Sequence, residues 1–141
     1  MADHPDCLFC RIATGEAEAE IVHSDDDHVA FLDIRPVFAG HTLLVPRIHI
    51  ETLEELPAGA IEPYFALGKR LTTAVREGMG SVGTFVAINN RVSQSVTHLH
   101  LHIVPRRPKD GLRGFFWPRN PYEDEAQMRE AGAAIRSALK G

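Results

Sequence analysis

The heptapeptide HLHLHIV, residues 98–104, alternates histidine with aliphatic side chains. Successive side chains of a β-strand point to opposite faces, so the pattern predicts a strand with His98, His100 and His102 on one face and aliphatic core residues on the other. Three imidazoles about 7 Å apart along one face have no packing rationale. Histidine titrates near neutral pH and serves as a nucleophile, an acid or base, or a metal ligand. The heptapeptide therefore predicts a strand that contains a reactive site.

Two chemistries fit this spacing. In the first, all three histidines bind one Zn²⁺, which activates a water molecule. In the second, the middle histidine attacks phosphorus and its neighbours offset charge. The spacing by itself does not decide between them.

Hydrophobic patterning on both sides of the heptapeptide predicts the remaining elements. The acidic run at residues 25–27 separates two short apolar runs and is typical of a hairpin turn. Pro46 ends a strand, and Gly78 with Gly80 ends a helix. The predicted strands cover residues 21–22, 29–32, 40–45 and 84–88, and the predicted helices cover residues 57–80 and 122–139. Strands and helices do not alternate regularly, which favours the α+β class over a doubly wound sheet.

The length of 141 residues and the hydrophobic content of 44% are typical of one globular domain. Apolar runs are only a few residues long, so we expect no membrane partner. The chain does not open with a basic stretch followed by an apolar one, so we expect no secretory signal and a cytoplasmic protein.

The net charge of −4 is unevenly divided along the chain. Residues 1–62 contain 13 acidic and 3 basic residues, about −10, and the remainder contains 6 acidic and 12 basic residues, about +6. A uniform face for nucleic acid is therefore not expected. The second half either attracts a phosphate-bearing ligand or forms an ordinary solvated face.

The heptapeptide is similar to the signature of the histidine triad (HIT) family, His-x-His-x-His followed by two apolar residues. The resemblance covers residues 7–106, most of the chain. It continues through the stretches CLFC at 7–10, LDI at 32–34, GHT at 40–42, PRIH at 46–49, NN at 89–90 and QSV at 94–96.

This resemblance implies a HIT-like α+β fold for a single domain at residues 1–141. The expected architecture is an antiparallel sheet of about five strands with a long crossing helix and a C-terminal helix, residues 105–141 forming a C-terminal arm and that helix. Family members usually form homodimers in which one sheet continues across two subunits, so a second copy of the chain is the expected partner.

The implied function is hydrolysis of a purine nucleoside phosphoramidate or a dinucleoside polyphosphate through a covalent nucleotidyl-histidine intermediate. By resemblance His100 is the nucleophile, while His102 and His41 contact the phosphate oxygens. Ser95 hydrogen-bonds the phosphate or the leaving group. The alternative is a nucleotide-binding regulatory module with little turnover. The intact His102 favours an enzyme, because phosphorylases and transferases of the family typically have glutamine there.

The resemblance also implies a nucleotide pocket. Asp33 corresponds to the residue that binds the ribose hydroxyls, a role that suits a carboxylate because it accepts from both. Gln94 and Asn89 are expected near the phosphate, although Asn90 competes with Asn89 for that contact. Ser93 stands where the family commonly has glycine. The expected walls of the base pocket are Leu8, Phe9, Phe31, Leu32 and Ile34.

Cys7 and Cys10 are the only cysteines. Such a pair is a redox couple, half of a zinc site, or two small hydrophobic residues, and zinc needs two further ligands. HIT proteins of the zinc-containing, prokaryotic type bind zinc with such a pair, the histidine of Pro-x-x-His and the first triad histidine. Those positions are His49 and His98 here. The resemblance thus implies a structural Zn²⁺, which argues against a three-histidine zinc hydrolase.

A basic and aromatic segment follows the triad. We hypothesise that it lies near the mouth of the pocket, of its own or of the other subunit, and selects the leaving group. The alternative is a solvated loop whose aromatic residues pack on the body. Its basic residues are Arg106, Arg107, Lys109, Arg113 and Arg119, and its aromatic residues are Phe115, Phe116 and Trp117.

Overall fold

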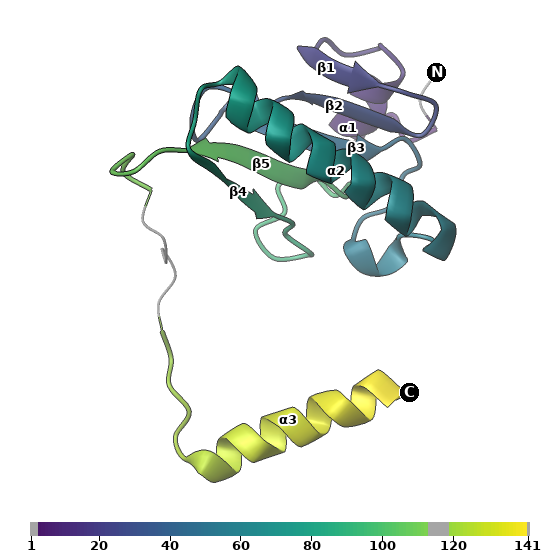
Figure 1. Cartoon of the computed structure of the whole chain (residues 1–141). Coiled ribbons are helices and arrows are strands. Elements are labelled where there is room, and N and C mark those ends of the chain that lie inside the picture. The colour runs from purple at the N-terminus through teal and green to yellow at the C-terminus, as the bar shows by residue number, and fades with distance from the viewer. Residues whose placement is uncertain (1–2, 113–118, 141) are drawn as a thin grey trace. The chain divides into compact units, whose positions relative to one another are not determined.

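A computed structural model describes residues 3–112 and 119–140 of the chain. It contains two compact units, Met1–Asp110 and Gly111–Gly141. The first unit holds the sheet and most of the helices, and the second holds a single helix (Figure 1). The assignment of all 141 residues to one histidine-triad domain stays a prediction.

The first unit is built on a five-stranded sheet with the order β1-β2-β3-β5-β4 (Figure 1). Every neighbouring pair of strands is antiparallel, which confirms the expected α+β class and its sheet. The strands are β1 (Ile21–Ser24), β2 (His28–Leu32), β3 (Thr42–Pro46), β4 (Gly83–Ala87) and β5 (Leu101–Arg106).

The acidic run forms the turn between β1 and β2, as predicted. Asp25 Oδ1 accepts hydrogen bonds from the backbone N–H groups of Asp27 and His28, at 2.9 and 2.8 Å. Asp25 N–H in turn donates to the His28 carbonyl. A side chain that satisfies backbone donors two and three residues ahead is the reason aspartate favours such turns.

The two faces of the sheet bury separate clusters, because alternate residues of β2 and β3 point in opposite directions. Ala30 and Leu44 pack with Leu101 and the apolar face of α2 (Ala58–Gly78), which crosses one face of the sheet (Figure 1). On the other face, Val29, Phe31, Leu43 and Val45 pack with Phe9 and Ile12 of α1 (Leu8–Ala13). Both central strands are therefore almost completely buried.

Strand boundaries differ from the prediction by one to three residues, and two of the differences have a clear structural cause. Gly40 has φ +96° and belongs to the turn before β3, so that strand begins at Thr42 and includes Pro46. β5 begins at Leu101 rather than at residue 98, because its ladder with β3 ends at the Leu44–Leu101 pair. The residues before Leu101 are held by other bonds, among them Leu99 N–H to the Ile50 carbonyl.

Two short helical elements were absent from the prediction, namely α1 and the 3₁₀ turn at Leu53–Glu55. Cys7 Sγ caps α1 by accepting from Cys10 N–H, so a cysteine takes the place of the usual oxygen-bearing cap residue. The helix predicted at 57–80 is α2, shorter by one residue at its start and two at its end. No helix in the described ranges is long and apolar enough to span a membrane.

The second unit contains α3 (Glu125–Lys140), which matches the helix predicted at 122–139 within three residues. None of its residues is buried within the unit. The expected apolar side is present, and Ile135 and Leu139 on it are 69% and 85% exposed.

Gly68 should be required by the contact between α2 and β5. A Cβ added there would lie 2.8 Å from Leu101 Cδ2, inside the core. We expect Gly68→Val to lower the free energy of unfolding by about 1–3 kcal/mol, as overpacking does. Gly59→Val is the control, because nothing lies within 4 Å of a Cβ at Gly59. Equal stability of the two variants in urea denaturation would contradict this packing.

Candidate functional site

The triad side chains keep the predicted alternation. Leu99, Leu101 and Ile103 belong to the cluster under α2, so His98, His100 and His102 point to the face that α1 covers. His98 and His100 lie in the segment that leads into β5, and His102 lies on the strand. His98 and His100 are buried and His102 is half-buried. The aliphatic side chains of this segment thus lie on one face of the sheet, and the imidazole side chains lie on the other.

The ring of His100 has a fixed orientation. Its Nδ1 lies 2.7 Å from the backbone carbonyl of His98 and donates to it, because a carbonyl can only accept. Burial lowers the pKa of His100, which keeps the imidazole neutral near pH 7. A neutral ring with the proton on Nδ1 leaves the lone pair on Nε2.

His41 and His102 form a directed hydrogen-bond chain. Val37 N–H donates to His41 Nδ1 at 3.1 Å, so the proton of a neutral His41 lies on Nε2. That nitrogen is 3.0 Å from His102 Nδ1, which must then accept. His102 is consequently protonated on Nε2. Burial, together with His100 and His41, lowers the pKa of His102 to about 4, so this tautomer is neutral near pH 7.

A cleft of about 360 Å³ opens in front of these histidines. That volume falls within the range of small-molecule sites. The lining residues anticipated from the sequence are Leu8, Phe9, Phe31, Leu32, Asp33, Ile34, Ser95, His100 and His102. Those that sequence reasoning missed are Ile12, Glu18, Ala19, Arg35, Leu43 and Val96. The spacing of Phe9 and Ile12 was the available signal for α1, which supplies part of this wall.

Three residues expected at the nucleotide do not line the cleft: His41, Asn89 and Gln94. His41 lies behind His102. The Gln94 amide donates to the Glu51 carbonyl and accepts from Arg91 N–H. Asn90 likewise accepts from Leu53 N–H at 2.9 Å. Both amides therefore hold the loop before the triad against residues 51–53.

Ser93 adopts φ +59° in that loop. The left-handed region favours glycine, which explains why glycine suits this position. The substitution by serine thus retains the turn at a cost in backbone strain.

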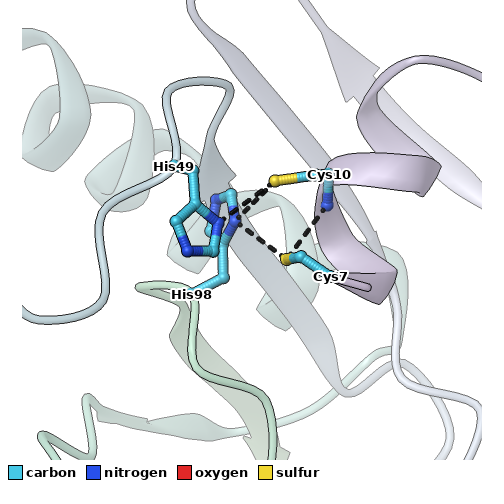
Figure 2. Close-up of side chains that lie close together, drawn as sticks. All are labelled: Cys7, Cys10, His49 and His98. Atoms are coloured by element: carbon cyan, nitrogen blue, oxygen red, sulfur yellow. Dashed lines mark hydrogen bonds between the residues drawn. The ribbon is translucent and has the colours of Figure 1, made fainter. Parts of the chain in front are cut away.

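Cys7, Cys10, His49 and His98 converge beside the cleft (Figure 2). Their ligand atoms all lie within 4.8 Å of one another. Cys10 Sγ is 3.2 Å from His49 Nδ1 and 3.4 Å from His98 Nδ1, and Cys7 Sγ is also 3.4 Å from His98 Nδ1. Both cysteines are free thiols. The start of α1, the loop after β3 and the segment before β5 thus supply two sulfur and two nitrogen ligands.

This cluster fits a tetrahedral zinc site. His98 Nε2 donates to the Pro46 carbonyl at 2.7 Å, which leaves Nδ1 unprotonated and directed at the cysteines (Figure 2). Such a bond on the second nitrogen is the usual support of a metal-binding histidine. Burial, and secondly Cys7, raises the pKa of the Cys10 thiol to about 12. A bound cation would reverse that penalty by stabilising the thiolate.

A second group with mutually close ligand atoms is formed by Asp33, His41 and His102. Both ring nitrogens of His41 already have hydrogen-bond partners, Val37 and His102. His41 therefore has no lone pair available for a metal, and we do not interpret this group as a metal site.

Part of the basic segment after the triad is described. Arg106 forms an ion pair with Asp110, Nε to Oδ2 at 2.6 Å, and Arg107 donates to the Met79 carbonyl. The residues Arg113, Phe115, Phe116 and Trp117 lie outside the described residues. The leaving-group role of this segment stays a hypothesis.

Comparison with known sequences finds HIT proteins. The sequence model of the HIT domain matches residues 14–109. The chain is 38% identical to an uncharacterised HIT-like protein of Mycobacterium tuberculosis, over 94% of this chain and 92% of that protein. It is 30% identical to adenosine 5′-monophosphoramidase of Schizosaccharomyces pombe, over 95% of this chain and 98% of that protein.

Solved structures of HIT proteins also resemble this chain. A member of the HIT family of proteins from Bacillus subtilis superposes with a TM-score of 0.83 at 34% identity, covering 94% of this chain and 96% of that one. A zinc-bound histidine triad family protein from Mycobacterium smegmatis gives a TM-score of 0.72 at 37% identity, with coverages of 95% and 98%.

The hydrogen bonds predict the tautomers of His41, His100 and His102. We expect long-range ¹H–¹⁵N spectra to show His41 and His102 protonated on Nε2 and His100 protonated on Nδ1. Because the pKa of His102 is about 4, its neutral pattern should persist as the pH falls from 7 to about 5. Protonation of His102 near its ordinary pKa of 6.5, or the opposite tautomer of His41, would refute the chain described above.

Proposed function

The chain belongs to the HIT domain family, and on that premise we propose that it is a nucleotidyl hydrolase with His100 as its nucleophile. Its substrate is a purine nucleoside phosphoramidate or a dinucleoside polyphosphate, and the intermediate is a covalent nucleotidyl-histidine. The main support is the bond from His100 Nδ1 to the His98 carbonyl, which directs the lone pair of a neutral, buried imidazole away from the backbone.

The first step forms a bond between His100 Nε2 and phosphorus and breaks the bond from phosphorus to the leaving group. Positive charge that develops on the imidazole is stabilised at Nδ1–H by the His98 carbonyl. The Nε2–H of His102 is a donor for a phosphate oxygen, and His41 fixes its direction. A leaving amine takes up one proton, for which the Ser95 hydroxyl in the cleft wall is the relay.

In the second step water attacks phosphorus and the bond to His100 Nε2 breaks. The proton lost by water replaces the one taken up by the amine, so the net reaction is hydrolysis. His100 returns to its starting tautomer because Nδ1–H stays bound to the carbonyl throughout. Splitting one displacement into two is the advantage of a covalent intermediate.

We place phosphoramidates ahead of dinucleoside polyphosphates as substrates. A leaving amine needs only a proton, whereas a polyphosphate needs cationic groups to bind its charge. Among the described residues that line the cleft, Arg35 is the only one with a permanent positive charge. The S. pombe relative named as a monophosphoramidase supports the same order.

We also propose that Cys7, Cys10, His49 and His98 hold one structural Zn²⁺. The zinc-bound relative from M. smegmatis supports this assignment. The ion would supply cross-linking of three chain segments and no chemistry at phosphorus, since all four positions of a tetrahedral site are filled by protein. His98 is then a scaffolding residue whose backbone carbonyl orients the nucleophile.

Finally, we propose a homodimer that joins α2 and β4 of two copies. β4 is an edge strand, and Val86 on it is 44% exposed. Ile61 and Phe65 on α2 are also exposed. An open edge with neighbouring apolar side chains is suited to pairing with a second copy.

Removal of the nucleophile should abolish turnover but not binding. We expect His100→Ala to lower kcat on adenosine 5′-phosphoramidate by at least about 1000-fold, because the covalent route is lost. The Kd for AMP should change by less than about threefold. His23→Ala, on the exposed hairpin, is the control. A variant that keeps more than a tenth of wild-type turnover would rule out the mechanism, and wild-type protein that binds AMP without turnover would favour a regulatory module.

The zinc assignment is tested by metal content and stability. We expect one zinc per chain by mass spectrometry of metals in protein purified without chelators. His49→Ala should lose most of the zinc and lower the Tm, because ligand binding to the folded state is part of the folding free energy. His23→Ala removes a histidine outside the cluster and should keep the zinc. Zinc-free wild-type protein with an unchanged Tm after chelation would disprove the assignment.

The dimer is tested at the two edges of the sheet. Sedimentation should give a species of about twice the chain mass of 15.6 kDa. Val86→Lys on β4 should shift it to monomer, because a charge opposes strand pairing at an apolar edge. Val22→Lys on β1, at the opposite edge and 54% exposed, should leave the dimer intact. Monomeric wild-type protein at micromolar concentration would refute the proposal.

A further inference from the structure

The cleft contains one acidic side chain to which the reaction gives no role. Among the described lining residues the charged ones are Glu18, Asp33 and Arg35. Asp33 serves the ribose in the proposed function. Glu18 is exposed, and in the described part of the chain its carboxylate has no hydrogen-bond or ion-pair partner. It is therefore available to a ligand.

Glu18 lies in the segment that leads into β1, beside the end of β2. Leu32 N–H donates to the Glu20 carbonyl, and Ile21 pairs with Phe31. Glu18, two residues before that hydrogen bond, and Ile34, two residues after it, both line the cleft. Asp33, which precedes Ile34, has Oδ2 at 3.8 Å from His41 Nδ1 and so lies near the histidines.

This order matches the order of groups in a nucleotide. With phosphorus at His100 and the ribose at Asp33, the base extends toward Ile34. The apolar walls there, including Phe9 and Phe31, suit the faces of an aromatic ring, and the rim suits its polar edge. Glu18 is a lining residue at this rim.

Resting on the proposed function, we infer that Glu18 makes the enzyme selective for guanine over adenine nucleotides. A carboxylate only accepts hydrogen bonds, and it can accept two from one planar group. Guanine presents two adjacent donors, N1–H and the N2 amino group. Adenine presents one donor, the N6 amino group, beside an acceptor, N1, which a carboxylate repels.

The inference predicts an order among three substrates. A bidentate contact to a base discriminates between bases, and an exposed contact does so less strongly than a buried one. We therefore expect kcat/KM for guanosine 5′-phosphoramidate to exceed that for the adenosine compound by about tenfold. The inosine compound, which keeps N1–H and lacks the amino group, should fall between them.

Substitutions at Glu18 distinguish the effect of its carboxylate on base selectivity from the effect of the apolar cleft walls. Glu18→Ala should bring the guanosine-to-adenosine ratio close to one. Glu18→Gln, which offers one donor and one acceptor, should shift the ratio toward adenosine. Glu20→Gln is the matched control. It removes the same charge two residues further along the chain, and the Glu20 side chain does not line the cleft. It should keep the wild-type ratio.

Two readouts keep this inference distinct from the function on which it rests. Turnover of all three compounds at equal kcat/KM, or a ratio unchanged by Glu18→Ala, overturns the inference and leaves the hydrolase intact. The Kd values of GMP and AMP for the wild-type and Glu18→Ala proteins provide the second readout. Tighter binding of GMP that depends on Glu18, in a wild-type protein that turns over none of the three compounds, overturns the hydrolase and supports the inference. Equal Kd values without turnover overturn both.

Discussion

The contacts of His98 hold this structure together. Its ring donates to the Pro46 carbonyl at the end of β3, its Nδ1 faces Cys7 and Cys10, and its backbone carbonyl accepts from the ring of His100. One residue thus joins the sheet, the N-terminal helix and the candidate nucleophile. The Cys/His cluster and the candidate nucleophile are therefore joined through a single residue.

The sheet makes this arrangement possible because its two faces bury different things. The face under α2 is aliphatic and contains Leu99, Leu101 and Ile103. The opposite face combines the α1 cluster with the imidazoles of the triad, and Phe9 contacts His100 edge to face with ring centroids 5.0 Å apart. Desolvation on that face keeps the histidines neutral, and a neutral imidazole is the form in which a ring nitrogen attacks an electrophile.

The described lining of the cleft contains few charged side chains. In the proposed reaction the phosphate would be bound by oriented N–H groups of neutral histidines, while the charged side chains of the described lining are Asp33, Arg35 and Glu18. A site of this kind stabilises a transition state through fixed dipoles and avoids the cost of burying several cations near one another. The same sparseness favours a leaving group that needs a proton over one that brings additional negative charge.

The sequence by itself determined the class of fold, the hairpin at the acidic run, the long helix and the alternation of the triad, because each depends on local periodicity or on one turn residue. It also named the four members of the Cys/His cluster, although only through resemblance. The tertiary structure alone decided where β5 begins, because that depends on where its ladder with β3 ends. It alone showed that His41 contacts His102 without lining the cleft and that Gln94 supports a loop. Glu18 emerged as a cleft residue for the same reason, since contacts between residues far apart along the chain leave no periodic signal in the sequence.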